Sequence, residues 1–413
     1  MASERDHTPI RQALVLAGGF GTRLGELTKS TPKPLLAVAG RPFIAYLIDW
    51  LARHGIDDII LSTGYLASSF DAFVTCNTWR DPYGKPVRVR AFAEGEPAGT
   101  AGAIKLHERQ LDEQFLLVNG DSFFDCDLSR VLAAAQTLAE EEALLTVRDV
   151  PDSGRYGRVT LDGEHVSAFE EKSAAGRGLV NAGITVLHRD VVQRIETLPY
   201  SIERQIYPAL AAEHKLRAIE LSGYFVDIGL PETYAAAQTE LPRALSKPAL
   251  FLDRDGVLNP DTGYLHRIED FSWMPGAVDG IARARAAGYR IVVVTNQAGV
   301  ARGYYGEDAV ERLHRHINAD LLRRGSGAWI DAFYYCPYHP DGTVPHYARA
   351  HEDRKPAPGM LLKAARDLAL DMSRSFMIGD KGLDIAAAEA AGIRGYLIGD
   401  GTIGDVLDRV AEA

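Results

Sequence analysis

The sequence has little cysteine and no long apolar run. Its 413 residues include three cysteines, Cys76, Cys126 and Cys336, and no two of them are closely spaced. This excludes a disulfide framework as the basis of the fold and is typical of a reducing compartment. No stretch approaches the ~20 apolar residues that a membrane span needs. The first residues, 1–12, are polar and lack a signal-peptide pattern. We therefore expect a cytoplasmic protein without a membrane partner.

An excess of positive charge is also missing. The formal net charge is −11, from 45 Lys and Arg against 56 Asp and Glu. Nucleic-acid surfaces need clustered cations, so we expect no nucleic-acid partner. An anionic ligand must then be held by a few local cations, backbone amides or metal ions. Small-molecule substrates are the expected partners, and the sequence leaves the oligomeric state open.

The length predicts more than one domain. A chain of 413 residues exceeds a typical domain, and 46% hydrophobic residues supply ample core material. Residues 238–248 carry two prolines, mixed charge and little periodicity, which is typical of a linker. We predict a first domain over residues 1–240, a linker over 241–248 and a second domain over 249–413.

Two carboxylates follow an apolar run near the middle of the chain. Residues 249–252 (ALFL) predict a buried strand, and Asp253 and Asp255 come at its carboxyl end. Alternate residues of a strand share a face, so both carboxylates can address one ligand there. Gly256 lets the backbone turn away at once. The pair suits aspartyl-phosphate chemistry, although a bare Asp-x-Asp would also suit the cap of the next helix.

A glycine-rich turn follows the first predicted strand, residues 13–17. The turn reads GGFGTR over residues 18–23 and matches neither the dinucleotide fingerprint nor the Walker loop. Its backbone amides can wrap a triphosphate, with Arg23 and Lys33 as charges on it, or its glycines can simply make turns. Strands and helices alternate through residues 115–118, which predicts a mostly parallel, doubly wound sheet.

Six segments spread over residues 14–237 resemble sugar-1-phosphate nucleotidyltransferases. They keep the order of that family and read LAGGFGTRL with PKP (16–24 and 32–34), PAGTAGA (97–103), VNGDS (118–122), FEEK (169–172), VNAG (180–183) and FVDIG (225–229). The resemblance implies a Rossmann-like domain of the GT-A-like type. In its reaction a sugar 1-phosphate oxygen attacks the α-phosphorus of a nucleoside triphosphate, and pyrophosphate leaves.

The resemblance also assigns roles within these segments. Asp121 and Asp227 would bind Mg²⁺, and Arg23 and Lys33 would act in catalysis by neutralising phosphate charge. The nucleophile is already an anion, so the site needs charge neutralisation and in-line placement rather than a strong base. Lys172, taken alone, would be an ordinary surface lysine. The residues that would bind nucleotide or sugar phosphate are Gly18, Gly19, Gly21, Thr22, Gly99, Thr100, Lys172 and Asn181.

The second half resembles the haloacid-dehalogenase phosphatases, which are also doubly wound and Rossmann-like. The ordered motifs are Asp253-x-Asp255, Thr295, Lys355 and Gly-Asp-x-x-x-Asp over residues 379–384. By this resemblance Asp253 would attack phosphorus, and Asp255 would protonate the leaving oxygen and later activate water. Mg²⁺ would lie between Asp253, the backbone carbonyl of Asp255 and Asp380. The substrate-binding residues would include Thr295, Asn296 and Lys355.

Finer matches point to two phosphatase subfamilies. Residues 253–259, 263–264, 295–303 and 354–360 resemble heptose 1,7-bisphosphate and histidinol-phosphate phosphatases. The extra cations Arg302, Arg354 and Lys381 suit a substrate with a second phosphate. Both subfamilies carry a zinc site, where this chain has Cys336, His339, His351 and Asp353. Those residues could form a tetrahedral zinc set, but with two thiolates lost we expect metal-free hydrogen bonding in this loop.

The two halves constrain each other. Removal of the C7 phosphate from heptose 1,7-bisphosphate leaves a heptose 1-phosphate, which is the kind of substrate that a sugar-1-phosphate nucleotidyltransferase accepts. Residues 40–43 and 227–229 look closest to heptose 1-phosphate guanylyltransferases. We therefore predict a bifunctional enzyme of GDP-heptose synthesis. The alternatives are a mannose- or glucose-type sugar, UTP, CTP or dTTP as donor, a histidinol-phosphate type of phosphatase, and an N-terminal half that is a non-catalytic sugar-nucleotide sensor.

Overall fold

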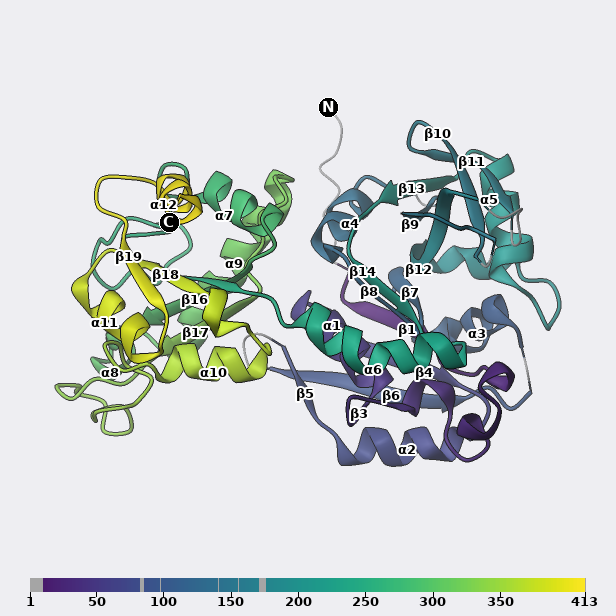
Figure 1. Ribbon diagram of the computed structural model, residues 1–413, viewed down its shortest axis with the longest axis horizontal. Helices are drawn as coiled ribbons and strands as arrows, with labels where there is room; N and C mark the ends of the chain where they lie inside the picture. The colour runs from purple at the N-terminus through teal and green to yellow at the C-terminus, as the bar shows by residue number, and fades with distance from the viewer. Residues whose placement is uncertain are drawn as a thin grey trace. The chain divides into compact units, whose positions relative to one another are not determined.

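The computed structural model describes residues 10–81, 85–96, 98–139, 141–154, 156–170 and 176–412. The chain divides into two compact units, Met1–Pro242 and Arg243–Ala413, and Figure 1 colours the first from purple to teal and the second from green to yellow. Each unit has its own sheet and its own apolar core, so the expected α/β class is confirmed. In the described part of the chain, no helix has both the length and the apolar composition of a membrane span.

The N-terminal unit is built on a ten-stranded mixed sheet. Its parallel part contains β1 (Gln12–Leu16), β4 (Asp58–Thr63), β6 (Pro86–Ala93) and β7 (Gln114–Asn119), with β1 between β7 and β4. Beyond β7 the order continues β12, β9, β13, β11 and β10, and β12 is antiparallel to β7. The parallel, doubly wound arrangement expected from the sequence therefore covers the part that follows the glycine-rich turn, and a largely antiparallel part extends it.

The other strands and helices of this unit complete the element order. The strands are β2 (Ala37–Val38), β3 (Arg41–Pro42), β5 (Trp79–Arg80), β8 (Ser122–Asp125), β9 (Ala143–Val150), β10 (Arg158–Asp162), β11 (His165–Glu170), β12 (Gly178–His188), β13 (Leu216–Glu220) and β14 (Tyr224–Asp227). The helices are α1 (Phe43–Arg53), α2 (Ala67–Cys76), α3 (Thr100–His107), α4 (Leu128–Ala135), α5 (Tyr207–Ala212) and α6 (Pro231–Leu245). β8 and β14 form a separate two-stranded ladder in which Asp227 pairs with Ser122. This ladder brings Asp227 beside Asp121.

The parallel strands of the N-terminal unit are buried on both faces. Leu14, Ile60 and Leu117 belong to one core, which includes residues of α3 and α5. Val15 and Leu61, whose side chains point to the other face, are equally buried. Burial on both faces explains why these strands appear in the sequence as continuous apolar runs rather than as alternating patterns.

The C-terminal unit has a wholly parallel sheet with β15 at its centre. The order is β17 (Ala332–Cys336), β16 (Arg290–Asn296), β15 (Ala249–Leu252), β18 (Phe376–Gly379) and β19 (Arg394–Leu397). The helices are α7 (Ala277–Ala286), α8 (Ala298–Ala301), α9 (Glu307–Arg324), α10 (Gly359–Asp367), α11 (Gly382–Ala390) and α12 (Ile403–Ala411). Phe251, Val292 and Met377 share a core with α10 and α11, and α7 and α9 lie across the sheet from α10 (Figure 1). Residues that follow β15 are therefore flanked by the ends of β16 and β18.

Much of the segment expected as a linker is helical. α6 runs to Leu245 although Pro242 lies inside it, and residues 246–248 separate it from β15. The divide between the two units falls after Pro242. The buried residues of α6 are Ala237 and Leu241, so its apolar stripe is too sparse to give a clear helical period.

Candidate active sites

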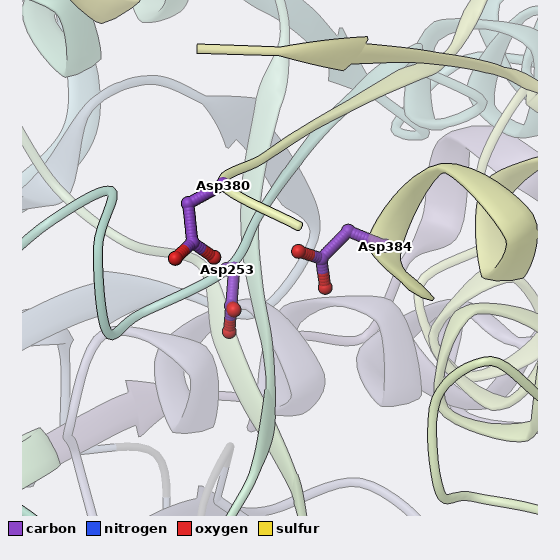
Figure 2. A group of neighbouring side chains, drawn as sticks. All are labelled: Asp253, Asp380 and Asp384. Atoms are coloured by element: carbon purple, nitrogen blue, oxygen red, sulfur yellow. The ribbon is translucent and has the colours of Figure 1, made fainter. Parts of the chain in front are cut away.

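The C-terminal unit gathers carboxylates at one edge of its sheet. Asp253 follows β15, Asp380 follows β18, and Asp384 lies in the first turn of α11. One oxygen from each lies within 4.8 Å of the others, and Figure 2 shows the three side chains turned toward a common space. The carboxyl ends of parallel strands meet at this edge, which is where a doubly wound sheet places its ligand.

Lys355 is the cation of this cluster. Its side chain is fully buried, and Nζ lies 2.9 Å from Asp253 Oδ1 and 2.6 Å from Asp384 Oδ1. Nζ also donates to the carbonyl oxygen of Val294 at 2.8 Å. An ammonium has three donors, so these contacts use all of them and satisfy a charge that would otherwise be costly to bury. Sequence reasoning did not give Asp384 a role, although it is the last residue of the motif at 379–384.

Asn296 fixes the backbone of Lys355. Its Oδ1 accepts from the Lys355 amide at 3.0 Å, and its Nδ2 donates to the Lys355 carbonyl at 3.0 Å. Thr295, buried near the end of β16, accepts from Gln297 Nε2 at 2.9 Å. The two predicted phosphate-binding residues of β16 therefore lie beside Lys355 and Gln297, and the Asn296 amide is occupied by the lysine loop.

Asp255 is surrounded by hydrogen-bond donors. Arg254 NH2 lies 3.0 Å from both of its oxygens, Asn259 Nδ2 lies 2.9 Å from Oδ1, and Gln297 Nε2 lies 3.1 Å from Oδ2. Arg254 is wholly buried and also donates to the carbonyl oxygen of Leu265 at 2.8 Å. These contacts fix the orientation of the Asp255 carboxylate. Arg254 and Asn259 lie inside the motif at 253–259, but their residue types alone did not reveal this role.

The electrostatics of the cluster suit a hard cation. Burial raises the pKa of Asp253 to about 6, against the opposing effect of the Lys355 ammonium. Burial also raises the pKa of Asp380, whose Oδ1 is buried and has no hydrogen-bond partner among the described residues. A carboxylate oxygen with unused lone pairs, next to a second carboxylate, fits a divalent cation with oxygen ligands. Asp253 and Asp380 would hold such an ion.

Of the three predicted outer cations, Lys381 lies beside this cluster. Lys381 Nζ is 2.7 Å from Asp261 Oδ2 and 3.4 Å from Asp380 Oδ2. Burial lowers the pKa of Arg354, and the nearby Arg302 lowers it further. A guanidinium whose charge is disfavoured by burial and by a second guanidinium is stabilised when an anion binds beside it.

The four candidate zinc residues do not come together. They are Cys336, His339, His351 and Asp353, and within the described part of the chain no three of them lie close enough to share an ion. The ring of His351 instead stacks on Tyr338, with centroids 4.2 Å apart, and the Arg349 guanidinium lies 4.6 Å from the Tyr338 centroid. Ring stacking and a cation–π contact on Tyr338 therefore organise this loop.

The N-terminal unit contains a cavity of about 670 Å³. Pockets for cofactors and drug-sized ligands are of this size. The predicted residues that line it are Gly18, Gly19, Gly21, Thr22, Arg23, Lys33, Gly99, Thr100 and Asp121. The glycine-rich turn, the segment around Gly99 and the turn after β7 are thus brought together at the carboxyl ends of the parallel strands.

Lys33 joins the two predicted metal carboxylates. Its buried Nζ lies 2.6 Å from Asp121 Oδ2 and 3.6 Å from Asp227 Oδ1. Burial raises the pKa of Asp227, and the charge of Asp121 raises it further. A Cβ on Gly229 would lie 2.8 Å from both Asp227 Oδ1 and Lys33 Nζ and 3.4 Å from Arg23 NH2, so glycine leaves this point open. Two carboxylates beside two cations fit a divalent cation that also carries substrate phosphates.

The predicted sugar-phosphate residues are less closely tied to the cavity. Asn181 lies in β12, and its Oδ1 accepts from the Gly183 amide at 2.8 Å. It is not among the described residues that line the cavity, but Asn119, which does line it, lies beside Gly183. Lys172 falls outside the described residues.

Sequence reasoning missed several residues that line the cavity. Glu94 follows β6 and accepts from Ser62 Oγ at 2.8 Å, and burial raises its pKa. Glu203 accepts from Thr100 Oγ1 at 2.7 Å. Glu94 stands at the end of a parallel strand, so the rule that found Asp253 would also have found it. Glu203 comes from a distant segment and gives no such signal.

We expect Gly256→Ala to weaken divalent-cation binding in the C-terminal unit. Gly256 has φ +93°, and a Cβ there would lie 2.4 Å from Asp380 Oδ2, so the carboxylate must move. Displacing a ligand from its oriented position typically costs about 10–100-fold in metal affinity. Calorimetric titration with Mg²⁺ measures this.

Gly263→Ala is the matched control for Gly256→Ala. Gly263 also has a positive φ, +75°, but a Cβ there would meet nothing within 4 Å. The Gly263→Ala substitution strains the backbone without displacing Asp380, so the Mg²⁺ affinity of this variant should match that of the unmodified protein. Equal losses in both variants would contradict the contact argument.

The comparisons with known proteins agree with this geometry. A family model described as nucleotidyl transferase matches residues 12–243, and one described as HAD-hydrolase-like matches residues 353–410. The D-glycero-beta-D-manno-heptose-1,7-bisphosphate 7-phosphatase of Rhodopseudomonas palustris is 48% identical over 150 residues, which are 36% of this chain and 82% of that protein. The Photorhabdus laumondii protein of the same name is 47% identical over 146 residues, 35% of this chain and 77% of that protein.

One solved structure is similar to more than half of the chain. HddC from Yersinia pseudotuberculosis is 29% identical, with a TM-score of 0.49, and the match covers 56% of this chain and 100% of HddC. With the family model and the phosphatase relatives established, the chain belongs to the nucleotidyl transferase family through its N-terminal unit and to the haloacid-dehalogenase-like heptose bisphosphate phosphatases through its C-terminal unit.

Proposed function

We propose that this chain is a bifunctional enzyme of GDP-heptose synthesis. Its C-terminal unit removes the C7 phosphate of D-glycero-D-manno-heptose 1,7-bisphosphate, and its N-terminal unit transfers GMP from GTP to the resulting heptose 1-phosphate. The observation that carries the proposal is the 48% identity to a heptose 1,7-bisphosphate 7-phosphatase, over 82% of that protein, in a chain that also has a nucleotidyl transferase unit. The product of the first reaction carries the phosphate oxygen that the second needs as its nucleophile.

The phosphatase reaction uses Asp253 as the nucleophile. Its carboxylate attacks the C7 phosphorus, an aspartyl-phosphate forms, and the bond from phosphorus to the sugar oxygen breaks. Asp255 gives its proton to that oxygen and later takes one from the water that hydrolyses the aspartyl-phosphate. Lys355, held by Asp384, reduces the repulsion between Asp253 and the anionic substrate. When bound by Asp253, Asp380 and the backbone carbonyl of Asp255, Mg²⁺ supplies further charge neutralisation.

The outer cations bind the phosphate that is retained. Burial lowers the pKa of Arg354 and the charge of Arg302 lowers it further, and Lys381 is half-exposed beside Asp380. A second phosphate on the substrate would offset the charges of Arg302 and Arg354, whereas a substrate with one phosphate brings no such anion to these two guanidinium groups. This supports a sugar bisphosphate over a histidinol-phosphate type of substrate.

The transfer reaction depends on positioning and charge. The glycine-rich turn cradles the triphosphate, and Arg23 and Lys33 hold its oxygens while the sugar phosphate attacks the α-phosphorus. Mg²⁺ on Asp121 and Asp227 supplies neutralisation of the leaving pyrophosphate. The convergence of Lys33, Asp121 and Asp227 on one point supports catalysis over a sensor that binds sugar nucleotides without transfer.

Glu94 supports guanine as the base. A carboxylate in a cavity for a triphosphate repels the phosphates, so it suits a part of the nucleotide that donates hydrogen bonds. Guanine presents two neighbouring donors, N1–H and the N2 amino group, whereas uracil and thymine flank one N–H with two carbonyl oxygens. A site built to pair with such donors rejects analogues that lack them by large factors.

The two chemistries should be separable by mutation. With heptose 1,7-bisphosphate, GTP and Mg²⁺ supplied together, we expect phosphate, pyrophosphate and GDP-heptose from the unmodified chain. Asp253→Asn should lower phosphate release by about 10³-fold or more and leave transfer to preformed heptose 1-phosphate nearly unchanged. Asp121→Ala should lower pyrophosphate release about 100-fold or more and spare phosphate release. Chromatography of all three products is the measurement, and loss of both activities in either folded variant would contradict two independent sites.

Glu94→Gln should change the preferred base. The amide replaces one acceptor oxygen with a donor, which opposes guanine N1–H and suits the O4 and N3–H groups of uracil. We expect kcat/KM for GTP to fall by about 100-fold and the ratio of GTP to UTP turnover to fall with it. Steady-state kinetics with GTP, UTP, CTP, dTTP and dGTP measures both. A selective loss against GTP relative to dGTP would instead place Glu94 on the ribose hydroxyl.

A further inference from the structure

A hydrogen-bonded chain runs from the nucleotide cavity into the core of the N-terminal unit. Glu94 lines the cavity and accepts from Ser62 Oγ at 2.8 Å. Ser62, fully buried in β4, lies 2.9 Å from His107 Nε2 at the end of α3. His107 is 3% exposed, its ring lies 5.6 Å from that of Phe92, and its Nδ1 has no hydrogen-bond partner among the described residues. A buried histidine with one used nitrogen needs an explanation.

The number of available protons determines which group donates in each hydrogen bond between Glu94, Ser62 and His107. Ser62 has one hydroxyl proton, and an ionised Glu94 has none, so Ser62 donates to Glu94 and must accept from His107. His107 is therefore the neutral tautomer with its proton on Nε2, and the bare Nδ1 lone pair faces the core. Burial lowers the pKa of His107 and the charge of Arg90 lowers it further, so the ring stays neutral.

The other tautomer of His107 would weaken Glu94 as a hydrogen-bond acceptor. If His107 carried its proton on Nδ1, Nε2 would compete with Glu94 for the Ser62 proton, and Glu94 would lose its one side-chain donor. A half-buried carboxylate without that donor is held less firmly and favours its protonated form. A protonated Glu94 presents an O–H where guanine N1–H needs an acceptor.

The backbone also holds Glu94 in this place. A Cβ on Gly18 would lie 3.0 Å from Glu94 Oε1, and one on Gly64 would lie 2.9 Å from the Gly18 carbonyl oxygen. Glycine at both positions lets the glycine-rich turn, the end of β4 and Glu94 approach closely. The Glu94 carboxylate is thus held by the hydrogen bond from Ser62, and the glycine-rich turn lies against it.

We infer that Ser62 and His107 are positioning residues that set base specificity, by holding Glu94 as an ionised, fixed acceptor for the N1–H and N2 amino donors of guanine. This rests on the proposed transfer of GMP from GTP. Neither residue is among the described residues that line the cavity. They act through the orientation and charge of Glu94, and so they affect the choice among nucleotides more than the rate of transfer.

Inosine triphosphate tests this, because it keeps N1–H and lacks the 2-amino group of GTP. The unmodified chain should prefer GTP to inosine triphosphate. Ser62→Ala should raise KM for GTP by about 10–100-fold with kcat little changed, and the ratio of GTP to inosine triphosphate kcat/KM should approach one. His107→Phe, which keeps an aromatic ring beside Phe92, should lower the same ratio. His107→Gln places an amide N–H where Nε2–H was and should restore most of it.

Thr63→Val is the matched control for these variants. Thr63 is the neighbouring buried residue of β4, and its hydroxyl donates to the Phe92 carbonyl oxygen at 3.0 Å. The Thr63→Val variant loses a buried hydroxyl of the same strand that does not contact Glu94. Its ratio of GTP to inosine triphosphate kcat/KM should therefore stay that of the unmodified chain. Phosphate release by the C-terminal unit of each sample gives its concentration of intact chain.

The outcomes separate the inference from the proposed function. A preference of the unmodified chain for UTP or dTTP would reject the proposed guanylyl transfer. A preference for GTP that Ser62→Ala and His107→Phe both retain would reject the positioning role alone. Equal losses with GTP and inosine triphosphate, or a Thr63→Val variant that loses the ratio equally, would also overturn it, because structural damage does not distinguish the two bases.

Discussion

A buried lysine between carboxylates is the constraint on which each site depends. Lys355 lies between Asp253 and Asp384, and Lys33 lies between Asp121 and Asp227. Such groups are stable inside a protein only when each charge has its partner, so the lysine and the carboxylates fix one another. The arrangement leaves oxygen atoms free for a cation and keeps a positive charge where phosphate oxygens must approach. The sheets of the two units thus share one arrangement, a buried lysine between two carboxylates.

Many of the residues predicted from sequence stand directly after strands or in the glycine-rich turn. Asp253 and Asp380 could be placed because carboxyl ends of neighbouring parallel strands meet at one edge. Asp384 was overlooked as a partner because its contact with Lys355 joins a helix to a loop. Ser62 and His107 look like ordinary core residues in sequence, because their contacts with each other and with Glu94 join separate segments of the chain. The helical end of α6 was missed because it buries few side chains.

Aromatic and cation–π contacts organise the loop before Arg354. Tyr338 stacks on His351 and lies near the Arg349 guanidinium, and Arg354 NH1 donates to the Tyr338 carbonyl oxygen at 3.3 Å. Stacking and cation–π contacts are individually weak, but several of them on one ring orient a loop. Tyr338 therefore connects this loop to the position of Arg354.

The ladder between β8 and β14 sets when the transferase centre can form. It pairs Asp227 with Ser122, so the second carboxylate reaches the first from more than a hundred residues further along the chain. As the polypeptide leaves the ribosome, the glycine-rich turn, Lys33 and Asp121 emerge early and remain without their last partner until β14 follows. Asp253 of the C-terminal unit emerges soon afterwards, when the carboxylate pair of the N-terminal unit has just become complete.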